Sequence, residues 1–229
     1  MAELAPGLAF HPGYLDRSAQ ESLLLELRTV LVEAPAFVPR MPRTGKAFSV
    51  RMTNCGTLGW VSDVSGYRYQ PAHPDTGRAW PPIPAAALRA WRDLAGYGPA
   101  PEACLVNLYD AGARMGLHQD RDEEDLAAPV LSLSLGDTAL FRWGGTDRRA
   151  PTRSVRLASG DALVLGGASR LAFHGVDRVV GGSSTLLGER GRINLTLRRV
   201  TPSPIGTRDP FDADREGHLQ GRGREGPAP

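Results

Sequence analysis

The sequence is poor in cysteine, in long apolar runs and in lysine. Its two cysteines, Cys55 and Cys104, are too few for a disulfide framework and form no CxxC motif, so we expect buried free thiols in a reducing compartment. No apolar run approaches the roughly 18 residues that a membrane-spanning helix needs. The first residues contain no basic leader, so we expect no signal peptide, a cytoplasmic location and no membrane partner.

Lysine is nearly missing, because Lys46 is the only lysine among 27 basic residues, which leaves 26 arginines. Arginine binds carboxylates and phosphates through paired hydrogen bonds and stacks on flat rings. An anionic or nucleic-acid partner is therefore allowed. A genomic codon bias would give the same count, and the net charge is only +2, so charge does not choose a partner.

The hydrophobic pattern predicts a mainly β protein with flanking helices. Apolar residues at helical spacing predict a helix over 16–32 that ends before Pro35, and a second helix over 84–94. The region 38–84 between them, rich in Gly, Pro and aromatic residues, is expected to be irregular. Six β-rich runs follow: 104–110, 128–136, 138–143, 154–167, 170–176 and 192–200. Short strands at this spacing are typical of a sandwich, barrel or jelly roll.

Five histidines are the candidate metal ligands, and two of them sit in a His-x-Asp pair. His73 and Asp75 lie in "QPAHPDTG", where the proline and glycine favour a turn. His118 and Asp120 lie in "LHQDRDE", and in an extended backbone residues two apart point the same way. A third ligand must come from elsewhere, and His174 in "SRLAFHGV", a short strand ended by glycine, is the candidate. Two histidines and a carboxylate suit non-haem iron(II); the alternative for His174 is a hydrogen-bonded core histidine.

The last run, "RGRINLTLRRV", has one apolar face and one polar face. Arg192, Asn194, Thr196 and Arg198 share the polar face, since they are spaced two apart. This face is either exposed to solvent or lines a pocket in which each arginine binds one carboxylate of a small dicarboxylate. Asn107 and Tyr109 in "VNLYD" share a face in the same way. A metal triad beside a dicarboxylate pocket is what a 2-oxoglutarate-dependent oxygenase requires.

Five segments of the sequence resemble the AlkB family of iron(II)/2-oxoglutarate dioxygenases. They are "NLYDAGARMGLHQDRDEEDLAAPVLSLSLGD", "GGASRLAFHGV" and "RINLTLR", together with "MTNCGTLGW" and "GYRYQP" upstream. The likeness is closest to the bacterial alkylation-repair enzymes and runs from about Phe10 to Arg199. It implies a double-stranded β-helix, or jelly roll, with an N-terminal nucleotide-recognition lid. It divides the chain into an extension with helices and lid (1–100), a dioxygenase core (101–200) and a tail expected to be disordered (201–229).

The resemblance also implies the site residues. The iron ligands would be His118, Asp120 and His174, which are also the catalytic residues. The 2-oxoglutarate contacts would be Asn107, Tyr109, Arg192, Asn194 and Arg198, with the far carboxylate on Arg192 or Arg198. The substrate-side residues would be Met52, Trp60, Tyr67, Asp122 and Arg148. Glu123 is expected to be a solvated acid.

The implied reaction is repair of DNA by oxidative demethylation of bases such as N1-methyladenine and N3-methylcytosine. Iron(II), 2-oxoglutarate and O2 take part, and succinate, CO2 and formaldehyde are released. The partner would be alkylated DNA, single- or double-stranded, with no obligate protein partner. Two alternatives stay open: the same chemistry on RNA bases, protein or a small metabolite, and a catalytically silent nucleic-acid-binding jelly roll. Trp60 and Tyr67 favour a flat base, and the intact triad argues against a silent protein.

Overall fold

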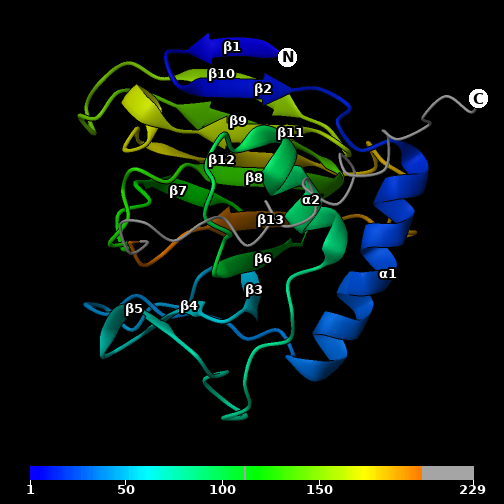
Figure 1. Ribbon diagram of the computed structural model, residues 1–229, viewed down its shortest axis with the longest axis vertical. Coiled ribbons are helices and arrows are strands. Elements are labelled where there is room, and N and C mark those ends of the chain that lie inside the picture. The colour runs from blue at the N-terminus through cyan, green and yellow to red at the C-terminus, as the bar shows by residue number, and fades with distance from the viewer. Residues whose placement is uncertain (111, 203–229) are drawn as a thin grey trace, which may run out of the picture.

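Two antiparallel β-sheets face each other in the computed structural model, which describes residues 1–110 and 112–202 (Figure 1). The larger sheet has seven strands in the order β1-β2-β11-β8-β13-β6-β3, and the smaller has four in the order β10-β9-β12-β7. A separate two-stranded hairpin, β4-β5, lies beside the edge where β3 sits. The predicted tail lies almost wholly outside the described residues.

The bounds of the elements are as follows. The strands are β1 (Ala2–Ala5), β2 (Leu8–His11), β3 (Arg51–Gly56), β4 (Gly59–Asp63), β5 (Gly66–Gln70), β6 (Ala103–Tyr109), β7 (Met115–His118), β8 (Val130–Gly136), β9 (Thr138–Trp143), β10 (Arg153–Leu157), β11 (Ala162–Leu165), β12 (His174–Val180) and β13 (Arg192–Arg198). The helices are α1 (Arg17–Glu33), α2 (Ala85–Leu94) and a short 3-10 turn (Gly167–Ser169).

Strands β6 to β13 form the jelly roll that the resemblance implies, because consecutive strands alternate between the two sheets, except for the β9-β10 hairpin within the smaller sheet, and each sheet interleaves strands distant in sequence. The first three strands extend the larger sheet at both edges, with β2 paired to β11 and β3 paired to β6. The first hundred residues therefore supply part of the larger sheet as well as the helices and the hairpin.

Helix α1 begins where the sequence places it. The Asp16 side chain accepts a hydrogen bond from the Ala19 amide at 2.8 Å, which caps the first turn. Leu23, Leu27 and Val30 are buried on one face. The helix ends before Pro35, as predicted, since the residue ahead of a proline disfavours helical backbone angles. Helix α2 also matches its prediction, and its buried face carries Trp91.

Both helices pack on the face of the larger sheet that carries Ile193, Leu195 and Leu197 of β13. The apolar face of the last strand is thus covered. Its polar partner face, with Arg192 and Arg198 each less than a tenth exposed, points between the two sheets and not into solvent. The polar face therefore lines a cavity and is not exposed to solvent, while the binding of a dicarboxylate by its two arginines stays a prediction.

Three predictions of local structure were wrong. The region 38–84 contains β3, β4 and β5 and is not irregular. The run 154–167 is two strands, because Ser159 and Gly160 form a turn between β10 and β11. In the run 170–176, His174 begins a strand that continues to Val180, and Gly175 lies inside it. Gly175 is needed there because a Cβ atom would lie 2.5 Å from the Met115 carbonyl oxygen of β7.

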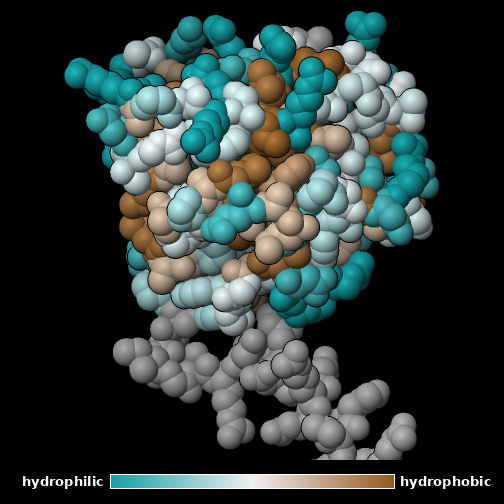
Figure 2. All heavy atoms as spheres, turned by 90° about the horizontal axis from the view of Figure 1, so that it is seen from above, coloured by the Kyte–Doolittle hydropathy of each residue, from teal (hydrophilic) through white to brown (hydrophobic). Residues whose placement is uncertain are grey.

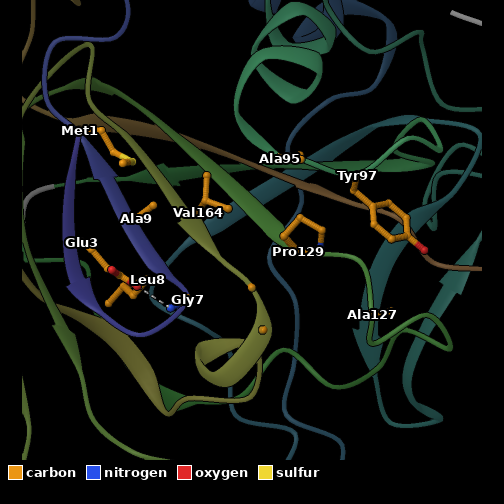
Figure 3. A pocket seen from close by; sticks show the side chains of 13 residues that line it. Met1, Glu3, Gly7, Leu8, Ala9, Ala95, Tyr97, Ala127, Pro129 and Val164 are labelled. Carbon is orange, nitrogen blue, oxygen red and sulfur yellow. Dashed lines mark hydrogen bonds between the residues drawn. The ribbon is translucent and has the colours of Figure 1, made fainter. Parts of the chain in front are cut away.

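The end of the molecule where β1 and β2 lie shows a band of hydrophobic residues between hydrophilic ones (Figure 2). A hollow of about 500 Å³ lies between the β1-β2 hairpin, the end of α2 and the segment before β8, with Leu8, Tyr97 and Pro129 on its walls (Figure 3). None of the predicted site residues lines this hollow. In the described part of the chain, no helix has the length and apolar character needed to cross a membrane.

Candidate metal and dicarboxylate site

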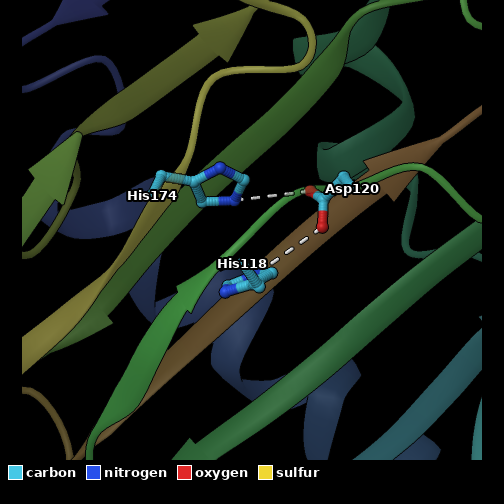
Figure 4. A group of neighbouring side chains, drawn as sticks. All are labelled: His118, Asp120 and His174. Atoms are coloured by element: carbon cyan, nitrogen blue, oxygen red, sulfur yellow. Dashed lines mark ion pairs between the residues drawn. The ribbon is translucent and has the colours of Figure 1, made fainter. Parts of the chain in front are cut away.

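The structure brings the three predicted iron ligands together (Figure 4). His118 is the last residue of β7, His174 is the first residue of β12, and the two are partners across the paired strands. The Nε2 atoms of His118 and His174 lie 3.6 Å from Oδ1 and Oδ2 of Asp120, respectively. One donor atom from each residue lies within 4.8 Å of the others. Strand pairing thus places the imidazoles, and the turn after β7 brings the carboxylate to them.

Each imidazole is oriented by its other nitrogen. Nδ1 of His118 lies 2.9 Å from the Gly116 carbonyl oxygen, and Nδ1 of His174 lies 2.9 Å from the Ala172 carbonyl oxygen. A carbonyl accepts only from a protonated nitrogen, so the proton of each neutral ring resides on Nδ1 and the Nε2 lone pairs face Asp120. Such an outer hydrogen bond fixes the tautomer of histidines that bind metals.

The charge states also suit metal binding. Burial, followed by the neighbouring His174, lowers the pKa of His118 to about 4, so its imidazole is neutral at pH 7. Burial alone would raise the pKa of Asp120, but Arg198 and the histidines hold that pKa well below its usual range. Two imidazoles and one carboxylate are the donor set that favours non-haem iron(II).

Every predicted site residue lines one cavity of about 570 Å³ between the two sheets. At its inner end Arg192 is 2% exposed. Its Nη2 donates to Ser134 Oγ at 2.8 Å and its Nη1 to the Leu157 carbonyl at 3.3 Å. Among the described residues no carboxylate forms an ion pair with it, and burial lowers its pKa to about 10. A buried cation without an anionic partner is costly, so this end of the cavity suits an anion.

The neighbouring polar groups differ in how many hydrogen bonds they already make within the protein. Asn107 Oδ1 is buried without a hydrogen-bond partner. The Tyr109 side chain is buried, and burial raises the pKa of its phenol to about 12, so it stays a hydrogen-bond donor at neutral pH. Asn194 donates to Ser132 Oγ at 2.7 Å and accepts from Thr196 Oγ1 at 3.2 Å. Asn107 and Tyr109 therefore offer more to a ligand than Asn194 does.

Arg198 differs from Arg192 in having acidic partners. Its Nη2 lies 2.9 Å from Asp120 Oδ1, its Nε lies 3.4 Å from Glu123 Oε1, and its Nη1 lies 3.1 Å from the Tyr69 hydroxyl. Since the charge of Arg198 is already balanced by these acids, Arg192 is the better candidate of the two arginines for binding the far carboxylate.

The mouth of the cavity is aromatic. Trp60 of β4 and Tyr67 of β5 stack with ring centroids 5.6 Å apart and planes 17° apart. Trp60 Nε1 donates to Asp122 Oδ2 at 2.9 Å, which joins the hairpin to the loop after the metal pair. Met52 of β3 is 3% exposed below them.

Arg148 closes the opposite rim. Its Nη1 donates to the Leu117 carbonyl at 2.9 Å, and its guanidinium lies 5.6 Å from the centroid of the Phe173 ring. The side chain is exposed. A fixed, exposed cation at the mouth of a cavity suits a phosphate or another anion.

Comparison with known proteins gives the same picture of a 2-oxoglutarate-dependent oxygenase site. Residues 7–198 match the model of the 2OG-Fe(II) oxygenase superfamily. An "alpha-ketoglutarate-dependent dioxygenase AlkB homolog" of Caulobacter vibrioides is 56% identical over 197 residues, which cover 86% of this chain and 89% of that protein. The alpha-ketoglutarate-dependent dioxygenase AlkB of Escherichia coli is 40% identical over 80% of this chain and 86% of its own length. The solved structure of OsALKBH1 superimposes with a TM-score of 0.73 at 31% identity, covering 86% of this chain and 99% of that one.

The chain belongs to the AlkB family of the 2OG-Fe(II) oxygenase superfamily. As an AlkB-family dioxygenase it uses iron(II), 2-oxoglutarate and O2. The residues present fit these groups: the His-Asp-His donors converge, and Arg192, which no carboxylate of the described residues pairs with, lies in the same cavity as the Tyr109 hydroxyl donor.

The structure corrects one expectation about this AlkB-family site and adds residues that the sequence did not reveal. Glu123 is not a solvated acid: it is 5% exposed, accepts from the Tyr69 hydroxyl at 2.5 Å and pairs with Arg170 at 3.0 Å. Arg170, four residues before His174, is itself buried. No periodicity separates a buried acid from an exposed one in a polar loop, so only the fold could show this.

The second His-x-Asp pair has the turn structure expected for it. The buried His73 ring accepts at Nδ1 from the Asp75 amide at 3.1 Å, and its Nε2 lies 2.7 Å from the Pro35 carbonyl oxygen. Both ring nitrogens are therefore used by the backbone. The two cysteines are free and buried, and they face each other as partners on β3 and β6.

Proposed function

We propose that this dioxygenase removes methyl groups from ring nitrogens of nucleic-acid bases, with alkylated DNA as its substrate. His118, Asp120 and His174 would hold the iron, and Arg192, Asn107 and Tyr109 would hold 2-oxoglutarate. The observation that supports this most is the position of the aromatic pair, Trp60 on Tyr67, at the mouth of the cavity that contains the metal triad.

The contribution of each group follows from its chemistry. When bound, iron with 2-oxoglutarate and O2 supplies the oxidising power that hydroxylates the methyl group; one oxygen atom ends in succinate and the other in formaldehyde. Arg192 balances the charge of the far carboxylate of 2-oxoglutarate in a buried place. Burial keeps the His118 imidazole neutral at pH 7, and the Nδ1 contacts of His118 and His174 with backbone carbonyls leave Nε2 of each ring directed at the metal position.

The substrate side selects a flat, positively charged ring. A methylated base must leave the helical stack to reach the metal, and this costs least where methylation has already broken the base pair. N1-methyladenine and N3-methylcytosine are cations, so stacking on Trp60 adds an attraction of about 0.5–2 kcal/mol. The Asp122 carboxylate, held by Trp60 Nε1, lies where it would face that cation.

RNA is the second candidate substrate, because some relatives are named as DNA demethylases and another as a tRNA demethylase. A protein of Arabidopsis thaliana named DNA N(6)-methyladenine demethylase is 30% identical over 86% of the chain, and a protein of Schizosaccharomyces pombe named tRNA demethylase is 36% identical over 44% of it. The cavity offers stacking and charge to a base and carries no feature that we assign to the sugar, so the DNA proposal needs a direct comparison.

Formaldehyde and succinate release tests the proposal. We expect both products, in equal amounts, from a DNA oligonucleotide with one N1-methyladenine, and the matched RNA is assayed beside it. The His118→Ala variant should release neither, while His11→Ala, which changes a histidine in β2 outside the cavity, should match the wild type. Turnover on RNA alone would replace DNA by RNA in the proposal, and succinate formation stimulated only by a protein or a metabolite would reject it.

A further inference from the structure

A buried carboxylate, Glu123, lies at the junction of three parts of the fold. Its Oε1 accepts from the Tyr69 hydroxyl at 2.5 Å and lies 3.4 Å from Arg198 Nε of β13. Its Oε2 accepts from Arg170 Nη2 at 3.0 Å, in the segment that leads to His174. None of the Glu123 side chain is exposed. Hydrogen bonds to charged groups in such a place are stronger than exposed ones.

The two arginines that bind Glu123 also hold Asp120. Arg198 Nη2 lies 2.9 Å from the Asp120 carboxylate, and Arg170 Nη1 donates to the Asp120 carbonyl oxygen at 2.6 Å. The side chain and the backbone of the predicted iron ligand are therefore fixed by guanidinium groups that share one acid. A shift of Glu123 would act on Asp120 through both.

Tyr69 connects this cluster to the mouth of the cavity. It lies in β5, directly opposite Trp60 of β4, and its hydroxyl also accepts from Arg198 Nη1 at 3.1 Å. The β4-β5 hairpin pairs with no strand of the two larger sheets in the described part of the chain. Its position therefore depends on loop and side-chain contacts, and the Tyr69 hydroxyl is its direct contact with both Glu123 and Arg198.

We propose that Tyr69 is a positioning residue which, through Glu123 and Arg198, couples the place of the β4-β5 hairpin to the place of Asp120. A base that settles against Trp60 would then favour the arrangement of Asp120 and Arg198 that binds metal and 2-oxoglutarate. This inference rests on the proposed function, because it needs a nucleic-acid base at the hairpin. The hairpin and the metal site are the two ends of one chain of hydrogen bonds and ion pairs.

Coupling between two binding sites is reciprocal, so each ligand changes the affinity for the other by the same factor. If methylated DNA tightens 2-oxoglutarate binding by some factor, 2-oxoglutarate tightens DNA binding by the same factor. We expect about fivefold or more in the wild type, the lower end of ordinary couplings. Tyr69→Phe removes only the hydroxyl and keeps the ring, so both factors should fall to near one, while the affinity for each ligand alone changes little.

The experiment uses the iron-loaded enzyme without oxygen, so that no turnover occurs. Binding of 2-oxoglutarate is followed by the visible charge-transfer absorption of its iron chelate, with and without an N1-methyladenine oligonucleotide. Binding of the labelled oligonucleotide is followed by fluorescence anisotropy, with and without 2-oxoglutarate. Tyr97→Phe is the matched control, since it removes another phenol-carboxylate bond, from Tyr97 to Asp125 at 2.6 Å, outside the cavity.

The inference is supported if neither ligand tightens binding of the other in Tyr69→Phe while both effects persist in Tyr97→Phe. A Tyr69→Phe protein that is less stable yet keeps the wild-type factors would overturn it, because the hydroxyl would then serve the fold alone. A wild-type enzyme that releases formaldehyde from the oligonucleotide but shows no coupling would also overturn it, and the proposed function would stand. Absence of formaldehyde release would count against the proposed function itself.

Discussion

Arg198 and Asp120 form an ion pair of 2.9 Å in which both side chains are less than a tenth exposed. The pair joins the last strand of the larger sheet to the metal site at the end of β7. Because Asp120 is the acid of the predicted triad, this contact keeps its carboxylate charged and in place when no metal neutralises it. The fold thus supplies a counter-charge for a ligand that would otherwise be a buried, unpaired anion.

Removing the arginine tests this balance. Arg198→Met fills similar space without charge and should lower the free energy of unfolding of the metal-free protein by about 3–5 kcal/mol, the usual cost of leaving a buried charge unpaired. Urea unfolding measures it. Manganese(II) should restore part of the loss, because a cation at Asp120 replaces the missing one. A loss below about 1 kcal/mol would mean that water already screens the pair.

Arg192 should act on 2-oxoglutarate and not on the substrate base. Arg192→Lys keeps the charge but loses the paired donors, so the KM for 2-oxoglutarate should rise about 10- to 100-fold, as for loss of a charged hydrogen bond. The kcat at saturation and the KM for the oligonucleotide should change little. Arg156→Lys, an exposed arginine of β10 outside the cavity, is the control. If the KM stays unchanged, another residue binds the far carboxylate.

The sequence predicts the parts of this fold whose pattern is local. Helix α1 shows its cap at Asp16 and its buried stripe, and β13 shows an apolar and a polar face. The strands β3 to β5 were missed because Gly, Pro and aromatic residues dominate 38–84, and the hairpin β4-β5 is half-exposed, so no alternation marks it. Its place is set by contacts between distant residues, such as Trp60 with Asp122.

The same division holds for the site. His118, Asp120, the candidate third ligand His174 and the polar residues of β6 and β13 could be proposed from the sequence pattern, and the family resemblance supplied the substrate-side residues. Glu123 and Arg170 could not, because each is polar in a polar segment and only the fold buries them against each other. A buried ion pair between residues 47 apart leaves no trace in local sequence. Tyr69 was likewise indistinguishable from ordinary packing.

Gly175 should control metal affinity although it is no ligand. A Cβ atom there would lie 2.5 Å from the Met115 carbonyl oxygen and 2.9 Å from that of Gly116, so β7 and β12 must move apart. These strands carry His118 and His174. Gly175→Ala should therefore cost about 1–3 kcal/mol of stability and weaken manganese(II) binding, measured by calorimetry, about tenfold or more.

Gly116→Ala is the matched control for this prediction, because a Cβ atom at Gly116 meets nothing within 4 Å. It should leave the affinity for manganese(II) unchanged. Equal effects of the two alanines would show that the glycines matter for backbone freedom and not for the close approach of β7 and β12.

Asp122 should select for charge on the base. Asp122→Asn keeps the acceptor for Trp60 Nε1 but loses the carboxylate charge. The kcat/KM for the cationic N1-methyladenine should fall about tenfold, equivalent to about 1.4 kcal/mol. A neutral methylated base such as N3-methylthymine should lose less than threefold. Parallel losses on both bases would show that Asp122 acts by placing Trp60 and not through its charge.

The pKa of His118 gives the metal-free protein a defined pH dependence. It is lowered to about 4, mainly by burial and then by His174, from 6.5 in the unfolded chain. The folded protein therefore binds fewer protons than the unfolded chain between these values. The stabilisation is complete above about pH 6.5 and is lost as the pH falls towards 4. Since the His118 side chain is 40% exposed, solvent reduces the slope to about 0.5–1 kcal/mol per pH unit, below the full 1.4.

Urea unfolding between pH 7 and pH 4.5 should show this slope in the wild type and a smaller one in His118→Gln, both freed of metal with a chelator. Equal slopes would assign the acid sensitivity to other groups. The same low pKa has a consequence for metal binding, because a proton competes with the metal for Nε2 only near pH 4. Protonation of His118 should therefore not weaken manganese(II) binding above about pH 5, whereas an imidazole with a pKa of 6.5 in its place would already bind more than tenfold more weakly there.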